Sequence, residues 1–280
     1  MKYTASLFDS IKGSLAKKEQ ESGFSDFLKM EMGKTYVVRL LPIIDADSKS
    51  AERTFFHYYH HLWDSVLDGK KTSCLCPTTY GEKCPIDEYR SKVYKKNNEA
   101  DIKAMQPIRR NENWLVNAFV VTDPSNPENE GQIKILRYGK QLDKIIQAAM
   151  SGEDAEELGE RIFDASENGV NLRIKCEKNE GGFPTYVSSK FITKASALPG
   201  VDNVEELYDN VKSLDTIFTK KSYEEIKEQF NTHYLGVDSK KAAPVKVDED
   251  DEDPELKEAA KPDKEEENPD AALDKLIADL

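Results

Sequence analysis

Hydrophobic and polar residues alternate in several short segments of the chain, and this spacing is typical of β-strands. The pair of segments 170–178 and 183–192 flanks the turn NEGG and predicts a β-hairpin. The loop PSNPENEG lies at 124–131, between two other predicted strands. The remaining alternating segments are 34–42 (KTYVVRLLP), 54–63 (TFFHYYHHLW), 114–123 (WLVNAFVVTD) and 132–139 (QIKILRYG).

Helical spacing of apolar residues occurs in fewer places. It predicts helices at 86–96 and 140–150, and two more near 203–213 and 222–231. A short amphipathic helix is also predicted within 2–20, with a frayed terminus as the alternative. Short strands, loops and a few helices together predict an α+β protein built on a small β-barrel with insertions.

The C-terminal part of the chain differs in composition from the rest. Residues 248–280 hold fifteen Asp and Glu against four Lys, a net charge of −11 out of the −13 of the whole chain. The remaining 247 residues therefore have a net charge of only −2, which leaves room for a basic surface. The acidic stretch predicts a disordered tail. Its last residues predict a docking peptide through Leu273, Leu276, Ile277 and Leu280, and a purely solubilising tail is the alternative.

The sequence has neither a run of eighteen apolar residues nor a secretory signal pattern, so we expect no membrane partner. Three of the four cysteines lie in the segment TSCLCPTTYGEKCPID (72–87), close to the histidines of HYYHHLW (57–63). In a reducing compartment such a cluster favours metal ligation over disulfides. We therefore predict one structural Zn²⁺. The candidate ligands are His61, Cys74, Cys76, Cys84 and Asp87, with His57 and His60 as competitors.

Basic residues recur beside aromatic ones in RRNENW (109–114), RYGK (137–140), GFPTYVSSKF (182–191) and YRSKVYKK (89–96). Proteins that bind single-stranded nucleic acids use this combination, because cations follow the phosphates while rings stack on bases. Each aromatic residue alone is equally compatible with a core position. No phosphate-binding loop, nucleophile elbow or zinc-hydrolase motif is present, so we expect no enzyme.

Four segments carry a family resemblance: FVVTDPSNPENEGQIKILRYGK (119–140), VVRLLP (37–42), GFPTYVSSKF (182–191) and the ending LDKLIADL (273–280). In these segments the chain resembles the single-stranded DNA-binding proteins of T-even-type bacteriophages, where the first corresponds to a strand–loop–strand segment. The family's zinc site has the spacing H-x12-C-x9-C-x2-C, which matches His61, Cys74 and Cys84 and places Asp87 where the last cysteine is expected. Because zinc prefers sulfur, Cys76 is favoured over Asp87 as the fourth ligand, with His60 as a lesser alternative.

The resemblance implies an OB-fold β-barrel core with a zinc-bearing subdomain, and single-stranded DNA in a cleft between them. It implies three domains: a cooperativity segment at 1–21, a core at 22–236 with the zinc subdomain at about 57–110, and an acidic tail at 237–280. The N-terminal segment departs from the family's basic motif, since only SIKGS and SLAKKE approximate it. The implied DNA contacts are Arg109, Arg110, Trp114, Arg137, Tyr138, Lys140, Phe183 and Tyr186.

The resemblance further implies cooperative, sequence-nonspecific DNA binding in phage replication, recombination and repair. Self-association would use the N-terminal segment, and the tail would recruit replication and recombination proteins and compete with DNA for the cleft. The expected location is the cytoplasm of the infected bacterium, at replication forks. The alternatives from other classes are a zinc-stabilised protein-interaction scaffold and a zinc hydrolase, with RNA as an alternative ligand.

Overall fold

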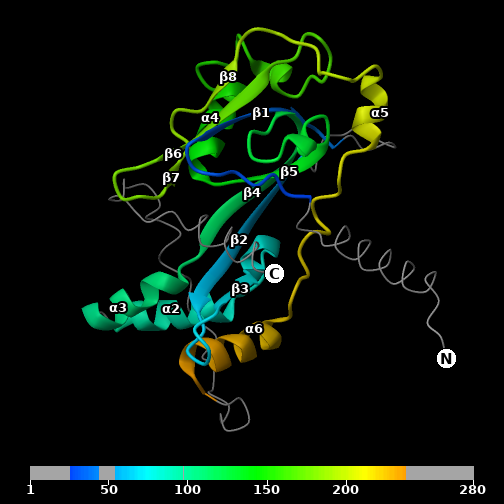
Figure 1. Ribbon diagram of the computed structural model, residues 1–280. Coiled ribbons are helices and arrows are strands. Elements are labelled where there is room, and N and C mark those ends of the chain that lie inside the picture. The colour runs from blue at the N-terminus through cyan, green and yellow to red at the C-terminus, as the bar shows by residue number, and fades with distance from the viewer. Residues whose placement is uncertain (1–25, 44–53, 97, 238–280) are drawn as a thin grey trace, which may run out of the picture. The chain divides into compact units, whose positions relative to one another are not determined.

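The computed structural model describes residues 26–43, 54–96 and 98–237 (Figure 1). Within these residues the chain forms two compact units. We call the first unit 1; its described part is 26–43, 54–56, 115–179 and 184–217. We call the second unit 2; its described part is 57–96, 98–114, 180–183 and 218–237. The predicted segment 1–21 and the tail residues 238–280, with Leu273, Leu276, Ile277 and Leu280, lie outside the described residues.

Unit 1 is built on a curled antiparallel sheet (Figure 1). Strand β1 (Lys34–Leu41) pairs on one side with β4 (Asn111–Thr122) and on the other with β6 (Asn171–Lys178). Strand β5 (Ile133–Tyr138) pairs with β4. The register of β1 against β4 shifts between Val37 and Val38, an irregularity of the kind that bends and twists a sheet. A mixed α and β structure with such a sheet is compatible with an OB-like fold.

The helices of unit 1 are α4 (Lys140–Ser151) and α5 (Val204–Asp209). Helix α4 follows β5 directly and buries Leu142, Ile146 and Ala149, the positions that its helical spacing predicts. The side chain of Asn203 caps the N-terminus of α5 by accepting a hydrogen bond from the backbone of Glu205. Both helices confirm elements that the sequence predicts.

The second arm of the predicted hairpin is interrupted. Instead of one strand over 183–192, two short strands, β7 (Pro184–Thr185) and β8 (Lys190–Ile192), each pair with β6. Between them the chain turns, and the backbone N–H of Ser189 donates to the carbonyl of Tyr186 at 2.9 Å. The hydroxyl of Ser189 accepts the N–H of Lys175 at 3.0 Å and so replaces a strand–strand hydrogen bond. The predicted hairpin of 170–178 and 183–192 is therefore confirmed, with its second arm divided into two short strands.

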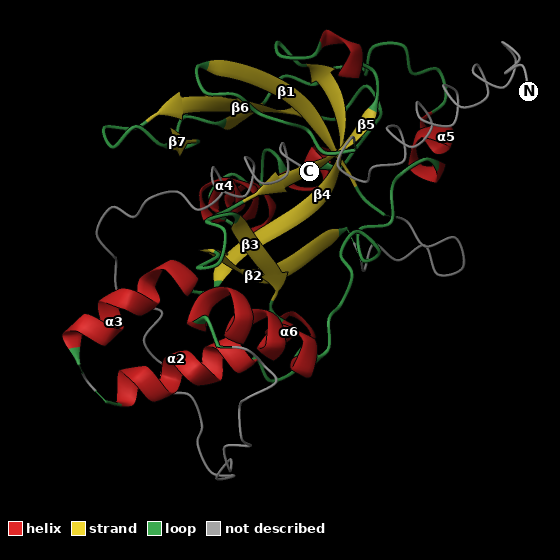
Figure 2. Ribbon diagram, turned by 60° about the horizontal axis from the view of Figure 1, so that its bottom comes forward, coloured by secondary structure: helices red, strands yellow, loops and turns green. Residues whose placement is uncertain are grey.

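Unit 2 consists of a β-hairpin and a group of helices (Figure 2). Strand β2 (Phe55–Asp64) pairs antiparallel with β3 (Lys71–Leu75), and α2 (Pro85–Lys95) contacts both α3 (Glu99–Met105) and α6 (Tyr223–Phe230). A one-turn π-helix at Asn231–Leu235 continues α6. The sequence does not predict α3, which begins where Asn98 accepts hydrogen bonds from two backbone N–H groups.

The core of unit 2 surrounds the three clustered cysteines. Cys74, Cys76 and Cys84 pack with Trp63, Ile86, Val93, Met105, Ile108, Ile226 and Phe230. Strands β2 and β4 each contribute residues to both units, because the unit boundaries fall at 56/57 and 114/115. Among the residues that the structure describes, helices are too short or too polar to cross a lipid bilayer.

Candidate metal centre and nucleic-acid interface

Four side chains of unit 2 converge on one point. The ligand atoms of His61, Cys76, Cys84 and Asp87 all lie within 4.8 Å of one another. His61 Nε2 lies 3.4 Å from Cys84 Sγ and 3.7 Å from Asp87 Oδ1. Cys76 Sγ lies 3.4 Å from Asp87 Oδ2. We call these four residues the metal cluster.

Local structure explains why these four meet. His61 belongs to β2, and Cys76 directly follows β3, the neighbouring strand. Cys84 is the residue before α2, and Asp87 stands in the first turn of that helix. Pro85 opens the helix, a position that favours proline because the first helical N–H has no partner within the helix. The β2–β3 hairpin and the start of α2 therefore deliver two ligand atoms each.

A hydrogen bond on the side of the ring away from the metal cluster fixes the orientation of His61. Its Nδ1 lies 2.8 Å from the carbonyl oxygen of Ile108, in a fully buried position. A carbonyl oxygen only accepts hydrogen bonds, so Nδ1 carries the proton and Nε2 presents its lone pair to the metal cluster. Histidine ligands of metals are commonly held by a second partner in this way.

The pKa values in the metal cluster are strongly perturbed. A hydrogen bond from Cys84 lowers the pKa of the Cys76 thiol to about 3, with a further contribution from His61. The same hydrogen bond, together with burial, raises the pKa of Cys84. Burial raises the pKa of Asp87 to about 6, against the attraction of His61 and two arginines. The opposite directions of these two pKa shifts follow from the one hydrogen bond between the two thiols.

The donor set suits zinc. Thiolate sulfur, imidazole nitrogen and carboxylate oxygen are the three donor types that Zn²⁺ takes in proteins. Tetrahedral ligands at about 2.0–2.3 Å from the ion lie about 3.5 Å from one another. Two separations from His61 Nε2, 3.4 Å to Cys84 Sγ and 3.7 Å to Asp87 Oδ1, agree with this value, and all separations in the cluster are within 4.8 Å. The residues present therefore fit a four-coordinate zinc ion.

The other candidate ligands have different neighbours. Cys74 is buried opposite His61 in the β2–β3 pairing and is not one of the four converging residues. Burial raises the pKa of its thiol to about 12. The Nδ1 of His60 lies 3.1 Å from the side-chain nitrogen of Asn113, and His57 contacts Glu112. The metal cluster therefore combines Cys76 and Asp87, which were alternatives in the sequence.

A group of rings lies on the same face of β2 as His61. Residues 57, 59 and 61 share one face because side chains alternate along a strand. The His57 ring stacks on Trp114, with centroids 4.7 Å apart and planes 17° apart, and meets Tyr59 edge-on at 4.8 Å. The Arg110 guanidinium lies over the Tyr59 ring, 4.5 Å from its centroid. We call His57, Tyr59, Arg110 and Trp114 the stacking array.

The stacking array is accessible in part. His57 and Arg110 are exposed, and Tyr59 and Trp114 are half-buried. The pattern of basic residues beside aromatic ones predicts Arg110 and Trp114, but it does not predict Tyr59 and His57. Their signal was present in the alternation of HYYHH, which places every second ring on one face.

The eight sequence-predicted DNA contacts fall four in each unit. Unit 2 contains Arg109 and Phe183, which are half-buried, together with Arg110 and Trp114 of the stacking array. In unit 1, Lys140 is exposed, whereas Arg137, Tyr138 and Tyr186 are buried, at 9%, 3% and 8% exposure. Tyr138 packs edge-on against Phe55, with ring centroids 6.5 Å apart. The two tyrosines thus occupy core positions in this structure.

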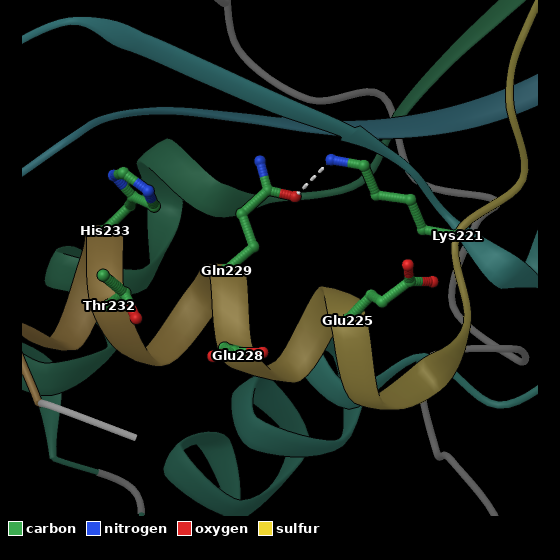
Figure 3. Close-up of a pocket in the computed structure, with 6 residues that line it drawn as sticks. All are labelled: Lys221, Glu225, Glu228, Gln229, Thr232 and His233. Carbon is green, nitrogen blue, oxygen red and sulfur yellow. Dashed lines mark hydrogen bonds between the residues drawn. The ribbon is translucent and has the colours of Figure 1, made fainter. Parts of the chain in front are cut away.

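A polar hollow runs along α6 in unit 2 (Figure 3). Lys221 Nζ donates a hydrogen bond to the side-chain oxygen of Gln229 at 2.8 Å. The ring of His233 is held by the hydroxyl of Ser65, 3.0 Å from its Nδ1. The lining residues are Lys221, Glu225, Glu228, Gln229, Thr232 and His233, so the hollow offers two carboxylates and few ring faces. It is a poorer surface for nucleobases and phosphates than the stacking array.

These features define a class: a mixed α and β protein with a curled antiparallel sheet and a compact cluster of metal-ligand side chains. The chain belongs to the family described as gp32 DNA binding protein like, whose model matches residues 32–235. This match confirms the family resemblance seen in the sequence.

Two curated relatives carry the name single-stranded DNA-binding protein. The protein of Enterobacteria phage T4 is 34% identical over 206 residues, which cover 69% of this chain and 64% of the relative. The protein of Enterobacteria phage T2 is 35% identical over 167 residues, which cover 56% of this chain and 53% of the relative. The matched region thus spans less than two thirds of either relative.

Proposed function

We propose that this protein is a non-enzymatic binder of single-stranded DNA that contacts its ligand without sequence preference through the stacking array. The observation that carries the proposal is the guanidinium of Arg110 over the ring of Tyr59, beside the His57–Trp114 stack. Rings stack on any base, and a guanidinium attracts phosphate, so this combination recognises a strand and not a sequence. The names of the two relatives support the choice of DNA.

Each member of the stacking array has a role in this proposal. Trp114 and Tyr59 offer ring faces to bases, and His57 holds Trp114 from one side. Arg110 binds phosphate or stacks on a base. From the family resemblance we add Arg109, Arg137, Lys140 and Phe183 as further DNA contacts. Tyr138 and Tyr186 remain predicted contacts, which require DNA to reach nearly buried rings.

We propose one structural zinc ion held by His61, Cys76, Cys84 and Asp87. When bound, the ion supplies a cross-link between a strand and a helix start, which stabilises a unit with a small core. The role is structural because all four positions are taken by protein side chains, whereas a catalytic zinc keeps one position open. The unit then keeps β2 and its ring-bearing face in place.

The wider role follows from the family resemblance. We propose cooperative binding through residues 1–21, and recruitment of replication and recombination proteins through the acidic tail 237–280. The tail also competes with DNA for a basic surface, since a tethered segment of net charge −11 has a high local concentration. The protein thus acts in phage DNA replication, recombination and repair, at replication forks in the cytoplasm of the infected cell.

Titration with oligothymidylate across a series of salt concentrations tests the proposal. We expect binding that weakens steeply with salt, because phosphate contacts release counterions. Arg110→Ala and Tyr59→Ala should each weaken binding, by about 1 kcal/mol or more for the stacking residue. Lys103→Ala, which removes an exposed cation from α3, is the matched control for general electrostatics. Absence of oligonucleotide binding at low salt contradicts the proposal and favours a protein-interaction scaffold.

A further inference from the structure

Asp87 contacts more than the metal cluster. Its Oδ1 lies 3.7 Å from His61 Nε2, and its Oδ2 lies 3.4 Å from Cys76 Sγ. The same carboxylate also contacts two cations: Arg110 Nη1 at 3.6 Å from Oδ2 and Arg90 Nη1 at 3.6 Å from Oδ1. One side chain therefore joins the metal cluster to a member of the stacking array.

Arg110 is held on two sides. Its guanidinium lies over Tyr59, and its Nη1 faces Asp87. The side chain of Arg110 is 34% exposed and that of Asp87 15%, so the carboxylate stays near the cluster while the guanidinium reaches solvent. A planar guanidinium over a ring is oriented by that contact, and a second contact at its edge restricts rotation further.

A carboxylate is suited to this double contact. It has two oxygens, so one can face a metal ion while the other accepts from an arginine. A thiolate has only one sulfur, a weak acceptor, so the same atom would have to ligate the metal and accept from the arginine. Arg90, which is buried on the same helix α2, braces Asp87 by an ion pair three residues along.

We propose that Asp87 is a positioning residue that links metal loading to DNA binding: it ligates the metal through one oxygen and holds Arg110 over Tyr59 through the other. The proposal rests on the proposed function for its DNA readout. Occupancy of the cluster then decides how well Arg110 is placed for a phosphate. In a variant that still holds the metal, loss of the carboxylate weakens DNA binding through Arg110.

Two variants separate the two contacts of Asp87. Asp87→Cys keeps a metal-ligand atom but offers Arg110 only that same sulfur, a weak acceptor. Asp87→Asn keeps the shape but has a single acceptor oxygen, which cannot face the metal cluster and Arg110 at the same time. Asp101→Asn, an exposed acid on α3, is the control for removing one negative charge.

The first measurement needs no DNA. Cobalt(II) titration, followed by thiolate-to-cobalt absorption, reports loading of the metal cluster. Modification by phenylglyoxal, followed by mass spectrometry, reports the accessibility of Arg110 relative to Arg109. We expect Asp87→Cys to bind one cobalt per chain and to react several-fold faster at Arg110, with Arg109 and the Asp101→Asn control unchanged. Unchanged reactivity at Arg110 in both Asp87 variants overturns the proposal.

The second measurement is oligothymidylate affinity in a double-mutant cycle. Cobalt-loaded Asp87→Cys should bind about three- to tenfold more weakly than the loaded parent, the size expected for one ion pair and one oriented cation–π contact. In the Arg110→Ala background the same substitution should change affinity by less than about twofold. An equal loss in both backgrounds, or no loss in either, overturns the proposal. A parent protein that binds no oligonucleotide contradicts the proposed function, while the phenylglyoxal result still decides the role of Asp87.

Discussion

The rings of His57 and Trp114 lie nearly parallel, with centroids 4.7 Å apart. His57 is fixed in this place by Glu112, whose carboxylate lies 2.8 Å from its Nε2. One face of the indole is therefore covered by a side chain that is itself held. A nucleobase therefore stacks on the opposite face of Trp114 and extends the stack to three rings, or it displaces His57.

Trp114 should report DNA binding by its fluorescence. The chain has two tryptophans, and the other, Trp63, is 2% exposed inside the core of unit 2. We expect oligothymidylate to quench the parent protein and the Trp63→Phe variant, but not Trp114→Phe. Trp114→Ala should weaken binding by about 1–3 kcal/mol, measured by anisotropy of a labelled oligonucleotide. Quenching that survives in Trp114→Phe would count against stacking at this ring.

Tyr138 should act mainly on stability. Because its ring is 3% exposed and packs against Phe55, Tyr138→Ala should lower the free energy of unfolding by about 3 kcal/mol or more. Tyr138→Phe keeps the ring and should cost less than about 1.5 kcal/mol. Urea denaturation gives both values. If Tyr138→Phe weakens oligonucleotide binding at unchanged stability, the hydroxyl contacts DNA and the ring is not purely a core residue.

Cys76 and Cys74, near the end of β3, provide a test variant and its control for metal binding. Cys76→Ser should weaken metal binding at least tenfold (about 1.4 kcal/mol) and lower the melting temperature of the loaded protein, because it removes one of the four ligand atoms. Cys74→Ser should keep one metal ion per chain, since Cys74 is not among those four. Equilibrium competition with a zinc-binding dye measures both. The reverse ranking would assign the ligand to Cys74.

Acid should weaken the cap of helix α6. The backbone N–H of Ser222 donates to Glu225 Oε2 at 2.7 Å, and its hydroxyl donates to the same oxygen at 2.7 Å. These hydrogen bonds lower the pKa of Glu225 below its ordinary value of 4.5. A carboxylate with a lowered pKa stabilises the fold above the unfolded value, and this contribution is lost as the pH falls through the folded value.

The consequence is measurable as a difference between variants. The gap in unfolding free energy between the parent and Glu225→Gln should be constant from pH 7 down to about 4.5 and then shrink. Glu224→Gln removes a neighbouring negative charge, leaves the Ser222–Glu225 hydrogen bonds in place and is the matched control. A gap that widens as the pH falls would contradict the assigned direction.

Regular alternation made most strands of the fold predictable. β1, β2, β4, β5 and β6 lie where hydrophobic and polar residues alternate, and α2, α4, α5 and α6 lie at or near the predicted helices. The arm 183–192 pairs with β6 as predicted, but it is divided where a serine hydroxyl replaces a strand hydrogen bond, a detail that residue spacing does not reveal. Helix α3 was not predicted, because its start depends on the N-cap at Asn98 and not on a periodic pattern of apolar residues.

The candidate site was predictable only in part. The pattern of a basic residue near an aromatic one predicts Arg110 and Trp114. The same pattern selects Arg137 and Tyr138, which are buried. Strand β5 ends with four successive buried residues, so both of its faces are covered there and alternation cannot separate core from surface. The choice between Cys74 and Cys76 depends on strand register, which a single sequence does not specify.

Cys74 and Cys76 stand two residues apart at the end of β3, and Cys74 lies opposite His61. A step of two along a strand keeps a side chain on the same face and moves it by about 7 Å. A chain with thiols at both places therefore has two candidate ligands on one face of the strand, about one strand repeat apart. Fixed intervals between cysteines select Cys74 here, whereas the structure brings Cys76 into the metal cluster.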